Sequence, residues 1–103
     1  MEVRGGLPVV ERITVDTTGE GRIPPMVTKW VQVSNEGANA LRIFFTSADF
    51  DAAEGYIELA ASTGFYEGPA EIGVGGPNGR DKLWLKGVGG DADVVLVWYL
   101  RRG

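Results

Sequence analysis

Short runs in which apolar and polar side chains alternate constrain the fold of this chain more than any other feature. One such run is Leu41–Thr46, in which the apolar residues Leu41 and Ile43 are separated by Arg42. A period of two residues is typical of a β-strand with one buried face. Most of the 16 glycines of the chain fall between these runs, where turns join one strand to the next. The pattern therefore predicts an all-β protein.

Eight short strands are predicted, and we expect them to form an antiparallel β-sandwich of the jelly-roll type. Helix signals are weak, because Gly55 and the alternation after it interrupt the one candidate, Ala48–Ala61. We expect a single helical turn near Asp49–Glu54. The predicted strands are Val9–Val15, Val27–Val33, Leu41–Thr46, Gly55–Leu59, Gly64–Tyr66, Glu71–Val74, Lys82–Lys86 and Asp93–Arg101.

The length of 103 residues fits a single domain over residues 1–103. Residues 1–6 and 17–25 are the segments least able to pack. We expect the first to form an N-terminal arm and the second a flexible loop. The first six residues lack the basic end and the apolar stretch of a secretory signal. Their composition favours a cytoplasmic or an already trimmed chain.

Composition excludes several classes of function. The chain contains no Cys and no His, so disulfides and thiolate or imidazole chemistry are not expected. Ten Lys and Arg residues against fourteen Asp and Glu residues give a net charge of −4, which argues against nucleic acid and anionic membranes as partners. Apolar residues make up 44% of the chain, too many for a disordered protein, and no run approaches the roughly twenty apolar residues of a membrane span. No cofactor and no metal are expected.

The alternation gives each predicted strand an inward and an outward face. Four aromatic residues, Trp30, Phe44, Trp84 and Tyr99, have the outward phase, where polar side chains are the rule. Either the protein's own loops cover these rings, or a partner subunit, another protein or a ligand does. The inward residues, which we expect to form the core, are Ile13, Val15, Val31, Val33, Leu41, Ile43, Phe45, Ile57, Leu59, Leu83, Leu85, Val94, Leu96, Trp98 and Leu100.

Lys82, Trp84 and Lys86 lie on one face of one predicted strand. This stripe could stack on a sugar ring, pair with acidic residues of a neighbour, or place lysine side chains over its own tryptophan. A sugar site usually adds planar polar side chains, and Gln32 is the only glutamine of the chain. The candidate interface residues are Trp30, Phe44, Lys82, Trp84, Lys86 and Tyr99.

Four carboxylates, Asp49, Asp51, Glu54 and Glu58, cluster in the sequence. Two carboxylates at a suitable separation can hydrolyse a glycosidic bond, and several oxygens on one loop can hold Ca²⁺. A chain of this length has no insertions that would form a cleft, and the spacing lacks the glycine of an EF-hand. We therefore expect a solvated acidic turn, no catalytic residues and a protein that is not an enzyme.

The region from Thr28 to Leu100 resembles the small β-sandwich accessory proteins of tailed-phage virions. The segments that carry this resemblance are Trp30–Gly37, Leu41–Thr46, Gly55–Leu59, Lys82–Gly87 and Asp93–Leu100. It implies a non-enzymatic virion structural protein, and above all a capsid decoration or cement subunit that binds and stabilises the major capsid shell. Other virion proteins are further candidate partners.

The resemblance also implies a location in the virion, after assembly in the host cytoplasm, and we expect a homo-oligomer. A carbohydrate- or receptor-binding module, for example of a phage tail, is the alternative. The position of Trp84 separates the two hypotheses. An exposed ring in a groove favours sugar binding, whereas a ring buried at a subunit boundary favours assembly.

Overall fold

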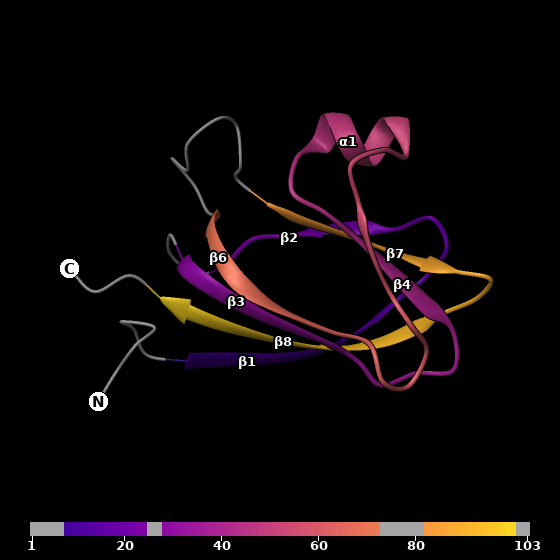
Figure 1. The fold of residues 1–103 in the computed structure, drawn as a ribbon, viewed down its shortest axis with the longest axis horizontal. Helices are drawn as coiled ribbons and strands as arrows, with labels where there is room; N and C mark the ends of the chain where they lie inside the picture. Colours follow the sequence, from indigo (N-terminus) through magenta and orange to yellow (C-terminus); the bar gives the residue numbers. More distant parts are fainter. Residues whose placement is uncertain (1–7, 25–27, 73–81, 101–103) are drawn as a thin grey trace.

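A computed structural model describes residues 8–24, 28–72 and 82–100 of the chain. These residues form strands and one short helix, so the predicted all-β fold is confirmed (Figure 1). The elements are β1 (Pro8–Val15), β2 (Glu20–Arg22), β3 (Thr28–Asn35), β4 (Ala40–Phe44), α1 (Ser47–Ala52), β5 (Ile57–Leu59), β6 (Phe65–Ile72), β7 (Leu83–Val88) and β8 (Ala92–Leu100).

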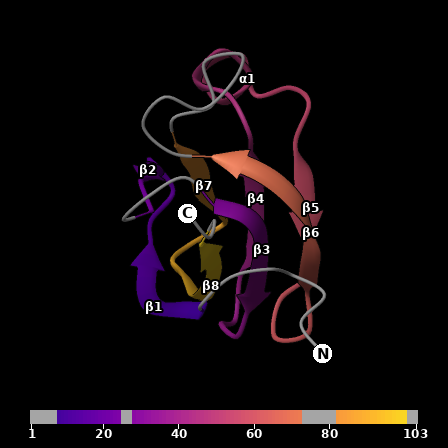
Figure 2. The same ribbon diagram turned by 90° about the vertical axis from the view of Figure 1, so that its left-hand side faces the viewer.

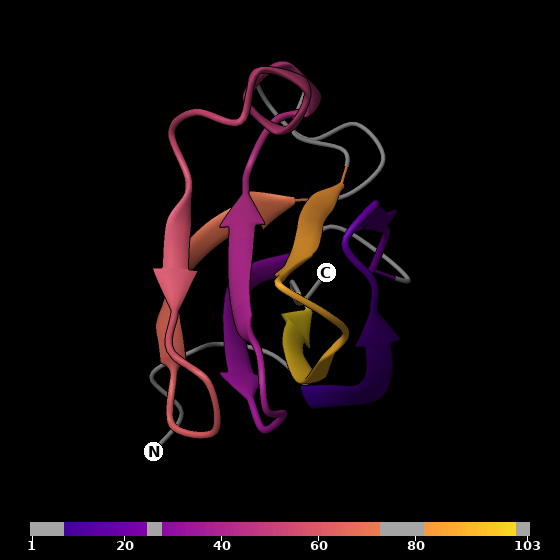
Figure 3. The ribbon, with the colours of Figure 1, turned by 90° about the vertical axis from the view of Figure 1, so that its right-hand side faces the viewer.

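The strands form two antiparallel sheets of four strands each, in the orders β1-β8-β3-β6 and β2-β7-β4-β5. The chain passes from one sheet to the other at each connection except that between β4 and β5. This is the double Greek-key arrangement of a jelly roll. Figure 3 shows β4 between β5 and β7 in the second sheet. Because both sheets are amphipathic, their inner faces meet and enclose the core.

The core consists of the residues with the inward phase. Val31, Leu85 and Trp98 are fully buried, as are most of the residues predicted to be inward. Ile13, Phe45 and Ile57 are half-buried and pack against them. The alternation therefore predicted these core residues correctly. The side chain of Leu100, which was also predicted to be inward, lies outside the described part. The buried hydrophobic residues packed in this core are Val15, Val31, Val33, Leu41, Ile43, Leu59, Leu83, Leu85, Ala92, Val94, Leu96 and Trp98.

Strand β2 was missed by the sequence analysis and lies inside the segment 17–25 that was predicted as a loop. Its three residues pair with β7 through Glu20↔Leu85 and Arg22↔Leu83. A strand of the sequence Glu-Gly-Arg has no apolar side chain, so no alternation marks it. The segment is a strand because it pairs with β7, which is distant in the sequence.

The prediction of two strands at Gly64–Tyr66 and Glu71–Val74 was wrong, because β6 is one strand through Phe65–Ile72. Gly68 and Pro69 interrupt the apolar pattern of this segment, and both residue types are typical of turns. Proline lacks a backbone N–H and is tolerated at the edge of a sheet. Strand β6 is such an edge strand.

The predicted helical turn near Asp49–Glu54 is found as α1. The helix begins at Thr46, whose Oγ1 accepts a hydrogen bond from the backbone N–H of Asp49 at 3.1 Å, as an N-cap residue does. It ends at Ala53, which has a left-handed backbone with φ of 55°. Seen from either side, α1 lies beyond the ends of β4 and β5, which it connects (Figures 2 and 3).

Some predictions lie outside the described residues. These are the N-terminal arm, residues 1–6, and the terminal residues of three predicted strands, Val27, Val74 and Arg101.

Candidate functional site

The outer face of the β2-β7-β4-β5 sheet carries a cluster of four aromatic rings, Phe44, Phe50, Tyr56 and Trp84. Phe44 and Trp84 are register partners on β4 and β7. The ring of Phe50 stacks on Trp84 with centroids 4.8 Å apart and meets Phe44 edge-on at 5.4 Å. Tyr56 also meets Phe44 edge-on, with centroids 5.5 Å apart. As a result Phe44 is fully buried although it has the outward phase.

Two glycines make room for this cluster on β2 and the turn before it. A Cβ atom on Gly21 would lie 3.1 Å from the indole ring of Trp84, its register partner. A Cβ atom on Gly19 would lie 2.7 Å from the ring of Phe50. The distance at Gly19 is shorter than real Cβ contacts, and the distance at Gly21 is tighter than almost all of them, so the indole ring would have to shift. The absence of side chains at these positions lets the two rings lie close to the sheet.

Three cationic side chains lie on the same face as the aromatic cluster, and two of them lie over its rings. The Nζ atom of Lys82 lies 5.1 Å from the ring centroid of Trp84. The Cζ atom of Arg42 lies 4.3 Å from the ring centroid of Tyr56, and its Nε donates a hydrogen bond to Oε1 of Glu58 at 3.0 Å. Lys86, half-buried, is the register partner of Arg42. The predicted stripe thus exists, with one lysine over its own tryptophan.

These contacts decide what covers Trp84 and Phe44. Among the alternatives for what covers these rings, the structure shows segments of the protein itself. Helix α1 provides Phe50, and the loop after it provides Tyr56. One face of the Trp84 ring is occupied by Phe50. Trp84 is therefore half-buried, with one face of its ring covered from within the chain.

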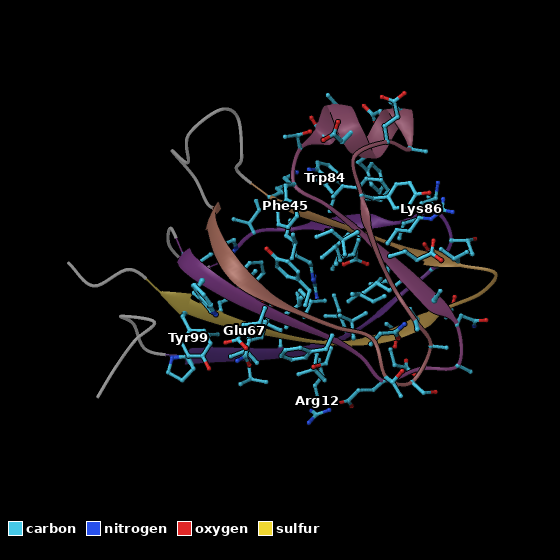
Figure 4. The ribbon with its side chains drawn as sticks, in the orientation of Figure 1. Arg12, Phe45, Glu67, Trp84, Lys86 and Tyr99 are labelled. Atoms are coloured by element: carbon cyan, nitrogen blue, oxygen red, sulfur yellow. The ribbon has the colours of Figure 1, made fainter. Side chains whose placement is uncertain are left out.

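The outer face of the other sheet is different, because the only helix in the described segments packs on the opposite side of the molecule. In Figure 4, Trp84 lies beside α1, whereas Tyr99, Glu67 and Arg12 lie on the other side. We call this surface the open face. The residues of this face form rows across the four strands β1, β8, β3 and β6: Pro8, Tyr99 and Trp30; Val10, Val97, Gln32 and Glu67; Arg12, Val95, Ser34 and Phe65.

The open face exposes two large apolar side chains. Val10 is 59% and Phe65 54% exposed, and these two residues lie on the two edge strands. Between them, Val95 and Val97 are half-buried on β8. Large apolar patches with polar borders mark interaction sites on soluble proteins. The face therefore combines an exposed apolar surface with a rigid sheet beneath it.

Trp30 and Tyr99, two of the predicted interface residues, are register partners on this face. Both rings are half-buried. The indole N–H of Trp30 donates a hydrogen bond to Oε2 of Glu67 at 3.0 Å. The structure thus divides the six predicted interface residues between two surfaces. Trp30 and Tyr99 lie on the open face, and Phe44, Lys82, Trp84 and Lys86 lie on the face that α1 covers.

The acidic cluster does not form a common site. Glu58 pairs with Arg42, and the backbone N–H and C=O of Asp49 bond to Thr46 and Glu54 at the ends of α1. Asp51 and Glu54 are exposed. Among the described residues no group of three or more acidic side chains is close enough to hold a metal ion.

Sequence reasoning missed four residues of these surfaces: Phe50, Tyr56, Val10 and Phe65. The available signal for Phe50 was Thr46 followed three residues later by Asp49, which resembles a helix start with a capping pair. Val10 and Phe65 were recognisable only as apolar residues on the outward phase of two edge strands.

Comparison with protein-family models, with curated proteins and with solved structures finds no match for this chain. Within residues 8–24, 28–72 and 82–100, no helix is long and apolar enough to cross a membrane.

Proposed function

We propose that this protein is a non-enzymatic structural protein of a virion, a capsid decoration or cement subunit that binds and stabilises the major capsid shell. The observation that carries the proposal is the difference between the two outer faces. One face is covered by the chain's own helix, and the other is open and exposes the apolar side chains of Val10 and Phe65. A rigid sheet with such a face suits binding to other protein subunits.

Two further features support this role. The jelly roll is a fold of viral capsid domains, among others, and the segments from Thr28 to Leu100 resemble virion accessory proteins. The chain also contains no Cys and no His, which suits a protein whose role is binding. We place the protein in the virion, after assembly in the host cytoplasm.

Co-sedimentation with undecorated capsids tests the proposal. Wild-type protein is expected to pellet with capsids to saturation. Val10→Asp, on the open face, is expected to weaken the binding at least tenfold, whereas Ile23→Ser, which alters a similarly exposed apolar residue outside this face, is expected to leave it unchanged. Wild-type protein that stays in the supernatant at every concentration would refute the capsid role.

One observation favours the alternative, a carbohydrate- or receptor-binding module. Trp30 and Tyr99 lie side by side on the open face, next to the polar residues Gln32 and Glu67, and aromatic rings with polar neighbours are what a sugar ring stacks on. A panel of immobilised polysaccharides tests this function. Binding that is lost in Trp30→Ala and kept in Trp84→Ala would establish it in place of the capsid role.

A further inference from the structure

We propose that residues 47–55, helix α1 with the turn after it, are a hinged cover that opens from Phe44 and Trp84 while both sheets stay folded. In the closed position, which the structure shows, one face of the Trp84 ring is occupied. In the open position, that face and the ring of Phe44 become accessible. The cover lies on the side of the molecule opposite the open face, so the inference is independent of the proposed function.

Ring contacts attach the cover to the sheet. None of residues 47–55 is buried, and among them only Asp49 and Phe50 are half-buried. The ring of Phe50 stacks on Trp84 and meets Phe44 edge-on. A segment held by one apolar side chain loses little buried surface when it opens, and such segments are the least stable parts of a folded protein.

The hydrogen bonds of the cover lie within it and at its N-terminal end. The backbone N–H of Phe50 donates to the carbonyl oxygen of Thr46 at 3.1 Å, and that of Glu54 donates to the carbonyl oxygen of Asp49 at 3.0 Å. Across the described segments, no hydrogen bond or ion pair joins residues 47–55 to a strand of either sheet. The cover can therefore open without leaving a polar group of the sheets unpaired.

The helix depends on the ring contact for its own stability. It has six residues, whereas isolated helices shorter than about 12 residues are marginal in water. Asp51 lies in its last turn, where no basic side chain offsets the negative end of the helix dipole. We therefore expect the helix to melt in the same step in which Phe50 leaves Trp84.

Hinge positions lie at both ends of the cover. Thr46, directly before α1, has an extended backbone with φ of −137°. Ala53 and Gly55, after the helix, have left-handed backbones with φ of 55° and 63°. This conformation favours glycine, so the closed position holds strain at Ala53. A few residues at the ends of an element are where a hinge motion changes the backbone.

The strands beneath the cover are held more firmly. Strand β4 lies between β5 and β7 and pairs with both, and Ile43 and Leu85 on β4 and β7 are fully buried. Tyr56, outside the cover, contacts Phe44 through its own ring. Opening of the cover therefore uncovers part of the aromatic cluster and leaves the core between the sheets intact.

Amide hydrogen exchange, resolved by residue with NMR, tests the inference. The hydrogen-bonded amides of Phe50, Ala53 and Glu54 are expected to exchange at least about a hundredfold faster than those of β4 and β7, after correction for intrinsic rates. Low concentrations of urea should accelerate exchange in the strands and hardly in the cover, because local opening exposes little surface.

Two results of this experiment would overturn the inference. With one protection and one urea dependence for all amides, α1 would open only when the whole domain unfolds. With no protection of the α1 amides at all, there would be no closed cover.

Phe50→Ala tests the contact that holds the cover. The loss of the ring is expected to accelerate exchange of the α1 amides at least about tenfold. Glu54→Gln, an exposed change in the cover, is the control and should leave this exchange unchanged. Equal exchange in the wild type and in Phe50→Ala would refute the ring contact as the attachment of the cover.

Val33→Ala gives the opposite test, because Val33 is fully buried on β3 and lies in the core. Its truncation lowers the stability of the whole domain and is expected to accelerate exchange in β4 and β7 at least about tenfold. The exchange of the α1 amides should stay unchanged, since opening of the cover leaves the core intact. Acceleration of the α1 amides by the same factor would show that they exchange through global unfolding, and would overturn the hinged cover.

Discussion

The phenyl ring of Phe50 is stacked on the indole ring of Trp84, with 4.8 Å between the centroids and 30° between the planes. Phe50 belongs to α1 and Trp84 to β7, so the contact holds the helix on the outer face of the second sheet. Ring stacking of this kind adds about 0.5–1.5 kcal/mol to the burial of apolar area. The helix thereby covers an apolar surface that would otherwise lie open.

Replacing Phe50 is therefore expected to expose the cluster. Phe50→Ala should lower the free energy of unfolding by about 2 kcal/mol, less than the about 3–5 kcal/mol of a fully buried phenylalanine, because the ring is half-buried. Urea unfolding measures the change, and tryptophan emission should shift to the red as Trp84 gains solvent. Asp51→Ala, an exposed change in the same helix, is the control. Equal effects of both variants would show that the ring contact is unimportant.

The sequence predicted the core because burial follows the alternation directly. On β8, for example, Val94, Leu96 and Trp98 were predicted inward and are all buried. It did not predict β2, because Glu20, Gly21 and Arg22 owe their strand to β7.

The candidate site was predicted only in part. Trp30, Phe44, Trp84 and Tyr99 were identified as aromatic residues with the outward phase, and the structure places all four on outer faces. Which of these rings another part of the chain covers depends on tertiary contacts, such as that of Phe50 with Trp84. A residue's phase along its own strand carries no information about them.

Trp98 provides the second prediction, because it is fully buried and donates its indole N–H to Oε1 of Glu11 at 3.2 Å. Trp98→Ala should cost about 3–5 kcal/mol through the cavity it leaves. Trp98→Phe should cost less, since it fills most of the space and mainly removes the donor to Glu11. Glu11→Gln, which keeps an acceptor oxygen, is the control in the same unfolding experiment. A loss below about 1 kcal/mol for Trp98→Ala would contradict the face assignment of β8.

Asn35 provides the third prediction, because its buried side chain joins two loops. Its Nδ2 donates to the carbonyl oxygens of Asn39 at 2.8 Å and Ala60 at 3.1 Å, and its Oδ1 accepts from the N–H of Gly37 at 3.2 Å. Asn35→Ala should lower the free energy of unfolding by about 2–4 kcal/mol, since buried carbonyl and N–H groups lose their partners.

Asn35→Asp should cost more at neutral pH, because the introduced carboxylate cannot donate to those carbonyls. Its burial there raises the carboxyl pKa in the folded state above the value in the unfolded state. The protonated form is thus favoured by folding, and the stability of this variant relative to wild type should increase as the pH falls through the folded-state pKa. Thermal unfolding at several pH values measures the trend, and a relative stability that falls with acid would contradict it. Asn39→Ala, which removes a single exposed hydrogen bond to Asp91, is the control at about 1 kcal/mol or less.

Gly19 and Gly89 allow the packing beneath the aromatic cluster to be measured separately from backbone strain. Both have a left-handed backbone, with φ of 86° and 81°, so an alanine is strained by about 1 kcal/mol or more at either position. A Cβ atom on Gly89 meets only Asn39, at 3.9 Å, whereas one on Gly19 lies 2.7 Å from Phe50 and 2.8 Å from the carbonyl oxygen of Leu85. Gly19→Ala should therefore cost about 1–3 kcal/mol more than Gly89→Ala.

A double variant shows how much of this excess comes from the ring. If Phe50 is the main obstacle, Gly19→Ala should cost less in a Phe50→Ala background than in the wild type, because the methyl group then occupies space that the ring has left. The remaining excess over Gly89→Ala reports the contact with the carbonyl of Leu85, which no side-chain substitution removes. Equal costs of Gly19→Ala in both backgrounds would place the whole conflict at that carbonyl, and would mean that the ring of Phe50 shifts without loss.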